Sequence, residues 1–252
     1  MSTPRLAPAG KKRSAIYSDF EEAKARILKA IPQGPFYGLV TGPSGTGKTS
    51  LLREVAASCD RHRFQTYYLA HSQASSSGLG RFLADALHLG PRRFHTETLR
   101  SVGQTLRDLP LRLLLLIDEA NLLAEETLQE VRLLAESELD SPPLFTVLLA
   151  GLPELKAKLE APALFPLKRR LSLRVELNGL KKDEVAPFLA LRLGEPVCGR
   201  LPEEVVMAIF ERARGIPALV ESLARLCLEN GSEKEAVTLA SVTEVLESWE
   251  VA

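Results

Sequence analysis

Short apolar runs alternate with amphipathic segments over roughly the first two thirds of the chain. An uninterrupted apolar or β-branched run is typical of a strand buried on both faces, and apolar residues spaced three and four apart are typical of a helix. The pattern predicts strands at 36–41, 64–69, 113–117, 144–149 and 172–177. It predicts helices at 18–30, from about 48, and at 79–87, 97–109 and 125–138. Strands that alternate with helices in this way indicate a parallel α/β sheet with right-handed crossovers.

From Lys181 onward the pattern is helical only. Helices are predicted near 181–193, 202–214, 217–229 and 239–247. We therefore expect an α/β domain over 15–178 and a small all-α domain over 179–252.

The segment before the first helix differs from both domains. Residues 1–14 contain prolines and the basic run Lys11-Lys12-Arg13, but they lack the apolar stretch of a signal peptide. We expect a mobile basic arm, which either contacts DNA phosphates or is a solvated tail. Ser18 and Glu21 have the spacing of a capping box, which predicts the start of the helix at 18–30.

A phosphate-loop pattern, G-x-x-x-x-G-K-[ST], is present at 42–49 between the first predicted strand and the next helix. Glycines let backbone N–H groups turn toward phosphate oxygens where a Cβ would obstruct them. Lys48 can reach the β- and γ-phosphates, the Thr49 hydroxyl can bind Mg²⁺, and the following helix directs its positive end at the same phosphates. The residues predicted to bind ATP are Gly42, Pro43, Ser44, Gly45, Thr46, Gly47, Lys48, Thr49 and Ser50.

A pair of acidic residues, Asp118 and Glu119, directly follows the apolar strand at 113–117. A carboxylate at the tip of a central strand is where a Walker B aspartate holds Mg²⁺, so we predict a metal site made of Thr49 and Asp118. Glu119 is placed to act as the general base toward the attacking water. Either acid could instead cap a helix N-terminus.

Composition narrows the function classes only slightly. Lys and Arg together number 32, as do Asp and Glu, so any basic surface for nucleic acid must be local. The cysteines lie far apart with no C-x-x-C pair, which fits buried thiols in a reducing cytoplasm, and the histidines show no metal-ligand spacing. No apolar stretch approaches the roughly 20 residues that span a bilayer, so no membrane association is expected.

The chain resembles AAA+ ATPases of the ExeA/TniB/MuB-type group, which includes secretion-associated ATPases and ATPase regulators of bacterial DNA transposition. The segments that carry the resemblance lie at 36–42, 116–120, 148–155 and 215–220, and it spans about residues 15 to 230. It implies an AAA+ P-loop NTPase sheet with flanking helices, a small C-terminal α-helical lid, ATP with Mg²⁺, and homo-oligomers in the form of a ring or a helical filament. It also implies an arginine that acts in trans on a neighbour's γ-phosphate, and Arg170, in the run Lys168-Arg169-Arg170, is the preferred candidate. The alternative for this run is a solvated basic turn or a DNA contact.

Two positions depart from the group's pattern. Leu152 stands where a polar sensor residue often follows the fourth strand, and Ala218 stands where an arginine often follows the Gly-Ile-Pro motif. We therefore expect ATP hydrolysis to be slow, unless Arg214 or Arg225 compensates.

The resemblance leaves two function classes open. This chain carries neither the membrane span nor the cell-wall-binding region of the secretion-type relatives, which favours a cytoplasmic transposition regulator that binds double-stranded DNA without sequence preference and recruits a transposase. The predicted DNA contacts are Arg92, Arg93 and Arg100, with Ser75 to Ser77 and His95 as weaker candidates. The alternative is a protein-remodelling or secretion-assembly ATPase that acts on a partner polypeptide. A nucleotide kinase is disfavoured, because Asp118 and Glu119 form a water-activating pair.

Overall fold

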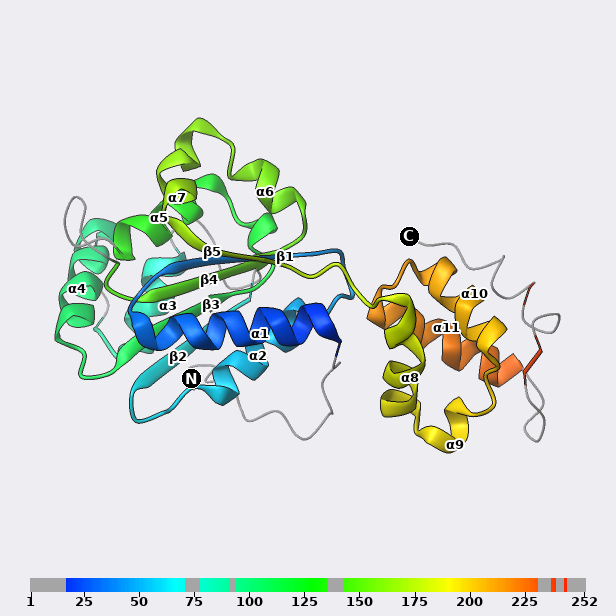
Figure 1. The fold of residues 1–252 in the computed structure, drawn as a ribbon. Coiled ribbons are helices and arrows are strands. Elements are labelled where there is room, and N and C mark those ends of the chain that lie inside the picture. Colours follow the sequence, from blue (N-terminus) through cyan, green and yellow to red (C-terminus); the bar gives the residue numbers. More distant parts are fainter. Residues whose placement is uncertain are drawn as a thin grey trace. The chain divides into compact units, whose positions relative to one another are not determined.

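The computed structural model describes residues 17–70, 78–90, 94–135, 143–230, 237–238 and 243 (Figure 1). Its described residues form two compact units. The first contains 23–42 and 48–176, and the second contains 17–22, 43–47 and the described residues from 177 onward. The tip of the predicted phosphate loop thus groups with the second unit, although it is covalently continuous with the first on both sides.

A parallel five-stranded sheet forms the centre of the first unit, as the sequence predicts. The strands are β1 (Tyr37–Thr41), β2 (Phe64–Leu69), β3 (Arg112–Ile117), β4 (Thr146–Gly151) and β5 (Leu171–Glu176). Their order is β2-β3-β4-β1-β5, and every neighbouring pair is parallel. The carboxyl ends of all five strands therefore meet at one edge of the sheet, where ligands of open α/β sheets bind.

Helices cover both faces of the sheet (Figure 1). One face packs on α3 (Gly78–Ala86), α4 (His95–Asp108), α5 (Glu125–Ala135), α6 (Glu154–Lys158) and α7 (Phe165–Arg170). The other face carries α1 (Ser18–Ala30), whose first turn groups with the second unit, and α2 (Lys48–Ser58). Because both faces are covered, five of the six residues of β3 are buried, which explains the uninterrupted apolar run in the sequence.

Apart from the loop tip, the described part of the second unit is built mainly of helices. It contains a short 3₁₀ turn at Lys182–Glu184, α8 (Val185–Leu193), α9 (Glu195–Cys198), α10 (Glu203–Ala213) and α11 (Pro217–Asn230). Its packing needs glycine at two positions: Gly179 and Gly215 both have positive φ, and the Gly215 carbonyl accepts a hydrogen bond of 2.7 Å from Leu180 N. A Cβ on Gly179 would lie 2.5 Å from that same carbonyl oxygen.

The structure departs from the sequence prediction in a few places. The short helices α6, α7 and α9 were not predicted, and α4 begins at His95 rather than at 97. α1 begins at Ser18 as predicted, and the Ser18 N–H donates to Glu184 Oε1 at 2.7 Å. The predicted helix at 239–247 lies outside the described residues apart from Thr243. Within the part of the chain that is described, no helix is long and apolar enough to cross a bilayer.

Candidate functional site

Asp118 and Thr49, the two predicted metal ligands, are in direct contact. Asp118 follows β3 at the carboxyl edge of the sheet and is 4% exposed. The Thr49 hydroxyl, in the first turn of α2, donates to Asp118 Oδ2 at 2.6 Å. A carboxylate and a hydroxyl held this closely offer the oxygen ligands that Mg²⁺ prefers, so the residues fit the ion.

Tyr68 is a second hydroxyl on the same carboxylate, and sequence reasoning missed it. Its phenol, on β2, donates to Asp118 Oδ2 at 2.8 Å. Burial, then the hydrogen bond to Asp118, raises the pKa of Tyr68 well above its ordinary value, so the phenol remains a donor at neutral pH. The alternation along β2 could have indicated that Tyr68 faces away from Tyr67, but not that it meets Asp118.

Glu119, the predicted general base, has an uncommon backbone conformation. Its φ of 51° and ψ of 36° lie in the left-handed region, and its N–H donates to Asp118 Oδ1 at 3.0 Å. Its side chain is exposed to solvent. A glutamate rarely adopts this conformation without a reason, and such residues concentrate at functional sites. The turn leaves the Glu119 carboxylate accessible to a water molecule while it fixes the neighbouring Asp118.

Lys48 lies at the start of α2, near the acidic residues of the edge. Its Nζ donates to the Gly42 carbonyl at 2.8 Å. Burial lowers the pKa of Lys48, whereas the negative charges of Asp118, Glu119 and Glu154 act in the opposite direction. Several carboxylates therefore act on the Lys48 ammonium group, which also donates to a backbone carbonyl of the loop.

The tip of the loop, Pro43 to Gly47, has the backbone of a phosphate-binding turn. Gly45 and Gly47 have positive φ, at 82° and 92°. Within the second unit, the Gly45 carbonyl accepts from Ala218 N at 3.2 Å and the Thr46 carbonyl accepts from the Tyr17 hydroxyl at 2.6 Å. A loop that binds an anion must direct its carbonyls elsewhere, and these two bonds occupy two of them.

Ala218 and Leu152 stand at the positions where the resemblance implies polar sensors. A Cβ on Gly45 would lie 2.9 Å from the Ala218 Cβ, so the loop and the start of α11 are close together here. A side chain larger than alanine at position 218 therefore has no room to point at Gly45. At the end of β4, the Leu152 N–H donates to Asn121 Oδ1 at 3.0 Å. Asn121 thus places a polar side chain beside the position at which Leu152 lacks one.

The arginines predicted from the sequence lie away from this cluster or outside the described residues. Arg170 is the last residue of α7, and its side chain is partly buried. Its neighbour Arg169 is exposed, with its guanidinium carbon 5.9 Å from the centre of the Phe165 ring. Arg100 is exposed on α4. Arg92 and Arg93, like Ser75 to Ser77, lie outside the described residues.

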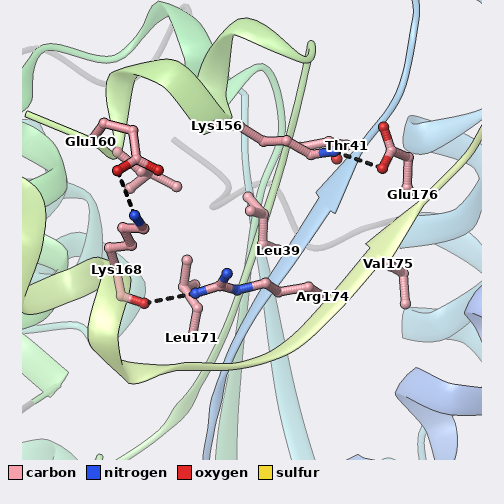
Figure 2. A pocket seen from close by; sticks show the side chains of 10 residues that line it. Leu39, Thr41, Lys156, Glu160, Lys168, Leu171, Arg174, Val175 and Glu176 are labelled. Atoms are coloured by element: carbon pink, nitrogen blue, oxygen red, sulfur yellow. Dashed lines mark hydrogen bonds and ion pairs between the residues drawn. The ribbon is translucent and has the colours of Figure 1, made fainter.

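A pocket of about 360 Å³ lies between β1, β5 and the helices α6 and α7 (Figure 2). Its charged residues are largely paired with one another. Lys156 donates to Glu176 at 2.6 Å, Lys168 pairs with Glu160, and Arg174 Nη2 donates to the Lys168 carbonyl at 3.2 Å. Two of these three cations are paired with carboxylates, and we assign the pocket no part in the ATP chemistry.

Comparison with protein families identifies the chain. A family model described as an AAA domain matches residues 33–159, half of the chain, which includes the phosphate loop and the Asp118 strand. The chain belongs to the AAA domain family. It is an ATPase with the AAA+ P-loop NTPase fold.

A curated relative is similar to the chain in sequence. General secretion pathway protein A of Aeromonas hydrophila is 27% identical over 208 residues, which cover 79% of this chain. This chain spans only 38% of the length of that relative.

Solved structures of low sequence identity share this fold, among them a Cdc6 protein and an ORC1 protein. Cdc6p of Pyrobaculum aerophilum is 18% identical, with a TM-score of 0.68 over 97% of this chain and 71% of that chain. The ORC1 protein of Aeropyrum pernix, solved in complex with DNA, is 15% identical, with a TM-score of 0.63 over 95% of this chain and 68% of that chain. At this level of identity the likeness supports the fold alone.

Proposed function

We propose that the chain binds ATP with Mg²⁺ at Lys48, Thr49 and Asp118, and that its ATP state assembles copies of the chain on double-stranded DNA to regulate transposition. The observation that carries the nucleotide step is the cluster at the carboxyl edge of the sheet. There the Thr49 hydroxyl is 2.6 Å from Asp118, and the exposed Glu119 is the next residue.

Each residue of the cluster has a separate chemical task in this proposal. Lys48 would bind the β- and γ-phosphates, and Thr49 and Asp118 would hold the metal ion, which would supply neutralising charge to the phosphate oxygens. Glu119 accepts the proton of the water that adds to the γ-phosphorus as the bond to the bridging oxygen breaks, which releases ADP and phosphate. Arg170 of a neighbouring copy would stabilise the charge that develops on the transferred group.

The DNA step has two supports. The fold is shared with a protein solved in complex with DNA, and Arg100 offers an exposed cation on α4. The transposase partner rests on the resemblance of the sequence to transposition regulators. A second candidate, an ATPase that assembles secretion machinery, is favoured by the 27% identity to general secretion pathway protein A.

Calorimetry tests the nucleotide step. The protein is expected to release heat on mixing with ATP and Mg²⁺, and Lys48→Ala is expected to abolish it because the main cation that binds the phosphates is removed. Lys29→Ala, which removes an exposed lysine of α1, is the matched control and is expected to bind as the wild type does. No heat with the folded wild-type protein would contradict the proposal at its first step.

Electron microscopy tests the assembly step. Glu119→Gln is expected to bind ATP but not to hydrolyse it, so it should form larger assemblies with ATP and duplex DNA than the wild type forms. Glu126→Gln, an exposed glutamate of α5, controls for the removal of one charge. Assemblies of equal size for wild type and Glu119→Gln would count against transposition regulation, and assemblies that need ATP but no DNA would favour the secretion candidate.

A further inference from the structure

Tyr68 occupies a position from which it can control the magnesium-binding carboxylate. β2 pairs with β3 in the register Tyr68 to Leu116 and Leu69 to Ile117, and Asp118 N extends this pairing by donating to the Leu69 carbonyl at 2.9 Å. The backbone of Asp118 is therefore fixed to β2, and the side chain of Tyr68 is delivered to the same carboxylate.

The direction of Tyr68 follows from the alternation of side chains along β2. Tyr67 and Leu69 belong to the core beneath α3, α4 and α5, and the Tyr67 hydroxyl donates to the Ala86 carbonyl at 2.8 Å. Tyr68 points to the opposite face, which carries α2 and Thr49. Two adjacent tyrosines on one strand thus serve different sides of the sheet.

We propose that Tyr68 is a positioning residue that orients Asp118 for Mg²⁺ and so sets the affinity of the site for the ion. Oδ2 of Asp118 accepts from Tyr68 and Thr49, and Oδ1 accepts from the Glu119 N–H. An ionised carboxylate has about four lone-pair sites, so one remains for the ion or for a water bound to it. This inference rests on the proposed binding of ATP and Mg²⁺.

The role of Tyr68 is separable from that of Thr49. The Thr49 hydroxyl is itself a predicted metal ligand, so its contact with Asp118 depends on how it binds the ion. Tyr68 is not a metal ligand in the proposal, so its phenol can donate to Asp118 Oδ2 both with and without the bound ion. Removal of a group that orients a metal ligand typically lowers metal affinity about tenfold or more.

The test is a Mg²⁺ titration of the full chain with a fluorescent ADP analogue. Tyr68→Phe removes only the phenol oxygen, and Tyr67→Phe removes an equivalent oxygen on the neighbouring residue without touching Asp118. We expect Tyr68→Phe to need about tenfold more Mg²⁺ for half-maximal strengthening of ADP binding, and Tyr67→Phe to match the wild type. ADP binding in EDTA is expected to be the same for all three proteins, because the phosphate loop is unchanged.

The outcomes separate the inference from the proposed function. If the wild type binds ADP in a Mg²⁺-dependent way and Tyr68→Phe has the same Mg²⁺ requirement as Tyr67→Phe, the role of Tyr68 is wrong and the ATP site stands. If the wild type shows no Mg²⁺-dependent binding, the proposed function fails instead. If Tyr68→Phe melts well below Tyr67→Phe, Tyr68→Gln, which keeps a donor, is compared with Tyr68→Leu, which has none. A Mg²⁺ requirement that is closer to the wild type for Tyr68→Gln than for Tyr68→Leu supports the need for a donor. Equal requirements of these two variants contradict it.

Discussion

Glu130 of α5 is a carboxylate buried where three helices of the first unit meet. It is 4% exposed, His95 Nε2 of α4 lies 3.0 Å from its Oε1, and a Cβ on Gly80 of α3 would lie 3.0 Å from the same oxygen. Burial raises the pKa of Glu130, while the charge of His95 and the Gly80 N–H act in the opposite direction. The folded protein therefore holds the Glu130 proton more tightly than the unfolded chain does.

The upward shift of the Glu130 pKa predicts how the stability of the protein depends on pH. A raised pKa in the folded state gives stability that is complete below the unfolded value, about 4.3, and is lost as pH rises through the folded pKa. Glu130→Gln cannot titrate, so its free energy of unfolding should increase relative to the wild type between pH 4 and 7. Urea denaturation at several pH values measures the difference, with the exposed Glu126→Gln as control. A difference that does not change with pH would contradict the prediction.

At the scale of elements, the join between α10 and α11 depends on one glycine. Gly215 has a φ of 71°, and a Cβ there would lie 2.4 Å from the Leu180 carbonyl oxygen and 3.2 Å from Phe210. Backbone cannot move aside as a flexible side chain can. The carbonyl of Gly215 also accepts from Leu180 N, so the chain before α8 is fixed to this turn.

Alanine at Gly215 is expected to destabilise the second unit by about 3 kcal/mol, because it adds left-handed strain to a backbone clash. Gly103→Ala is the matched control. Nothing lies within 4 Å of a Cβ at Gly103, which is in the middle of α4, so this change should raise stability by about 0.5–1 kcal/mol. Chemical denaturation measures both values, and equal effects of the two substitutions would show that the Gly215 turn relaxes freely.

The elements that could be predicted from the sequence are those whose pattern has one physical cause. The strands were readable because helices cover both faces of the sheet, and the loop at 42–49 was readable because glycine and lysine are required there. α6, α7 and α9 were missed because helices of four to six residues are too short to show a helical period. Tyr68 and Tyr17 were missed for another reason: their partners are 50 and 29 residues away, and no local pattern encodes such a pairing.

At the scale of the whole molecule, the prediction concerns DNA. The chain has no net charge, so binding to phosphates must come from a few local cations such as Arg92, Arg93 and Arg100. If Arg92 and Arg93 each neutralise a phosphate, the double alanine variant should reduce the slope of log affinity against log salt concentration by about 0.9 for each phosphate that is no longer neutralised. Arg61→Ala, in the turn before β2, is the control. An unchanged slope for the double variant would remove these two residues from the DNA surface.

The left-handed backbone of Glu119 costs stability at the residue that we propose as the catalytic base. Glycine or asparagine would adopt a φ of 51° with less strain, and the exposed glutamate side chain contributes little packing in return. Replacing Glu119 by glycine or asparagine would therefore be expected to raise the melting temperature. The same substitution would remove the residue that we propose as the base. A thermostable version of this ATPase has to gain its stability elsewhere and leave that strain in place.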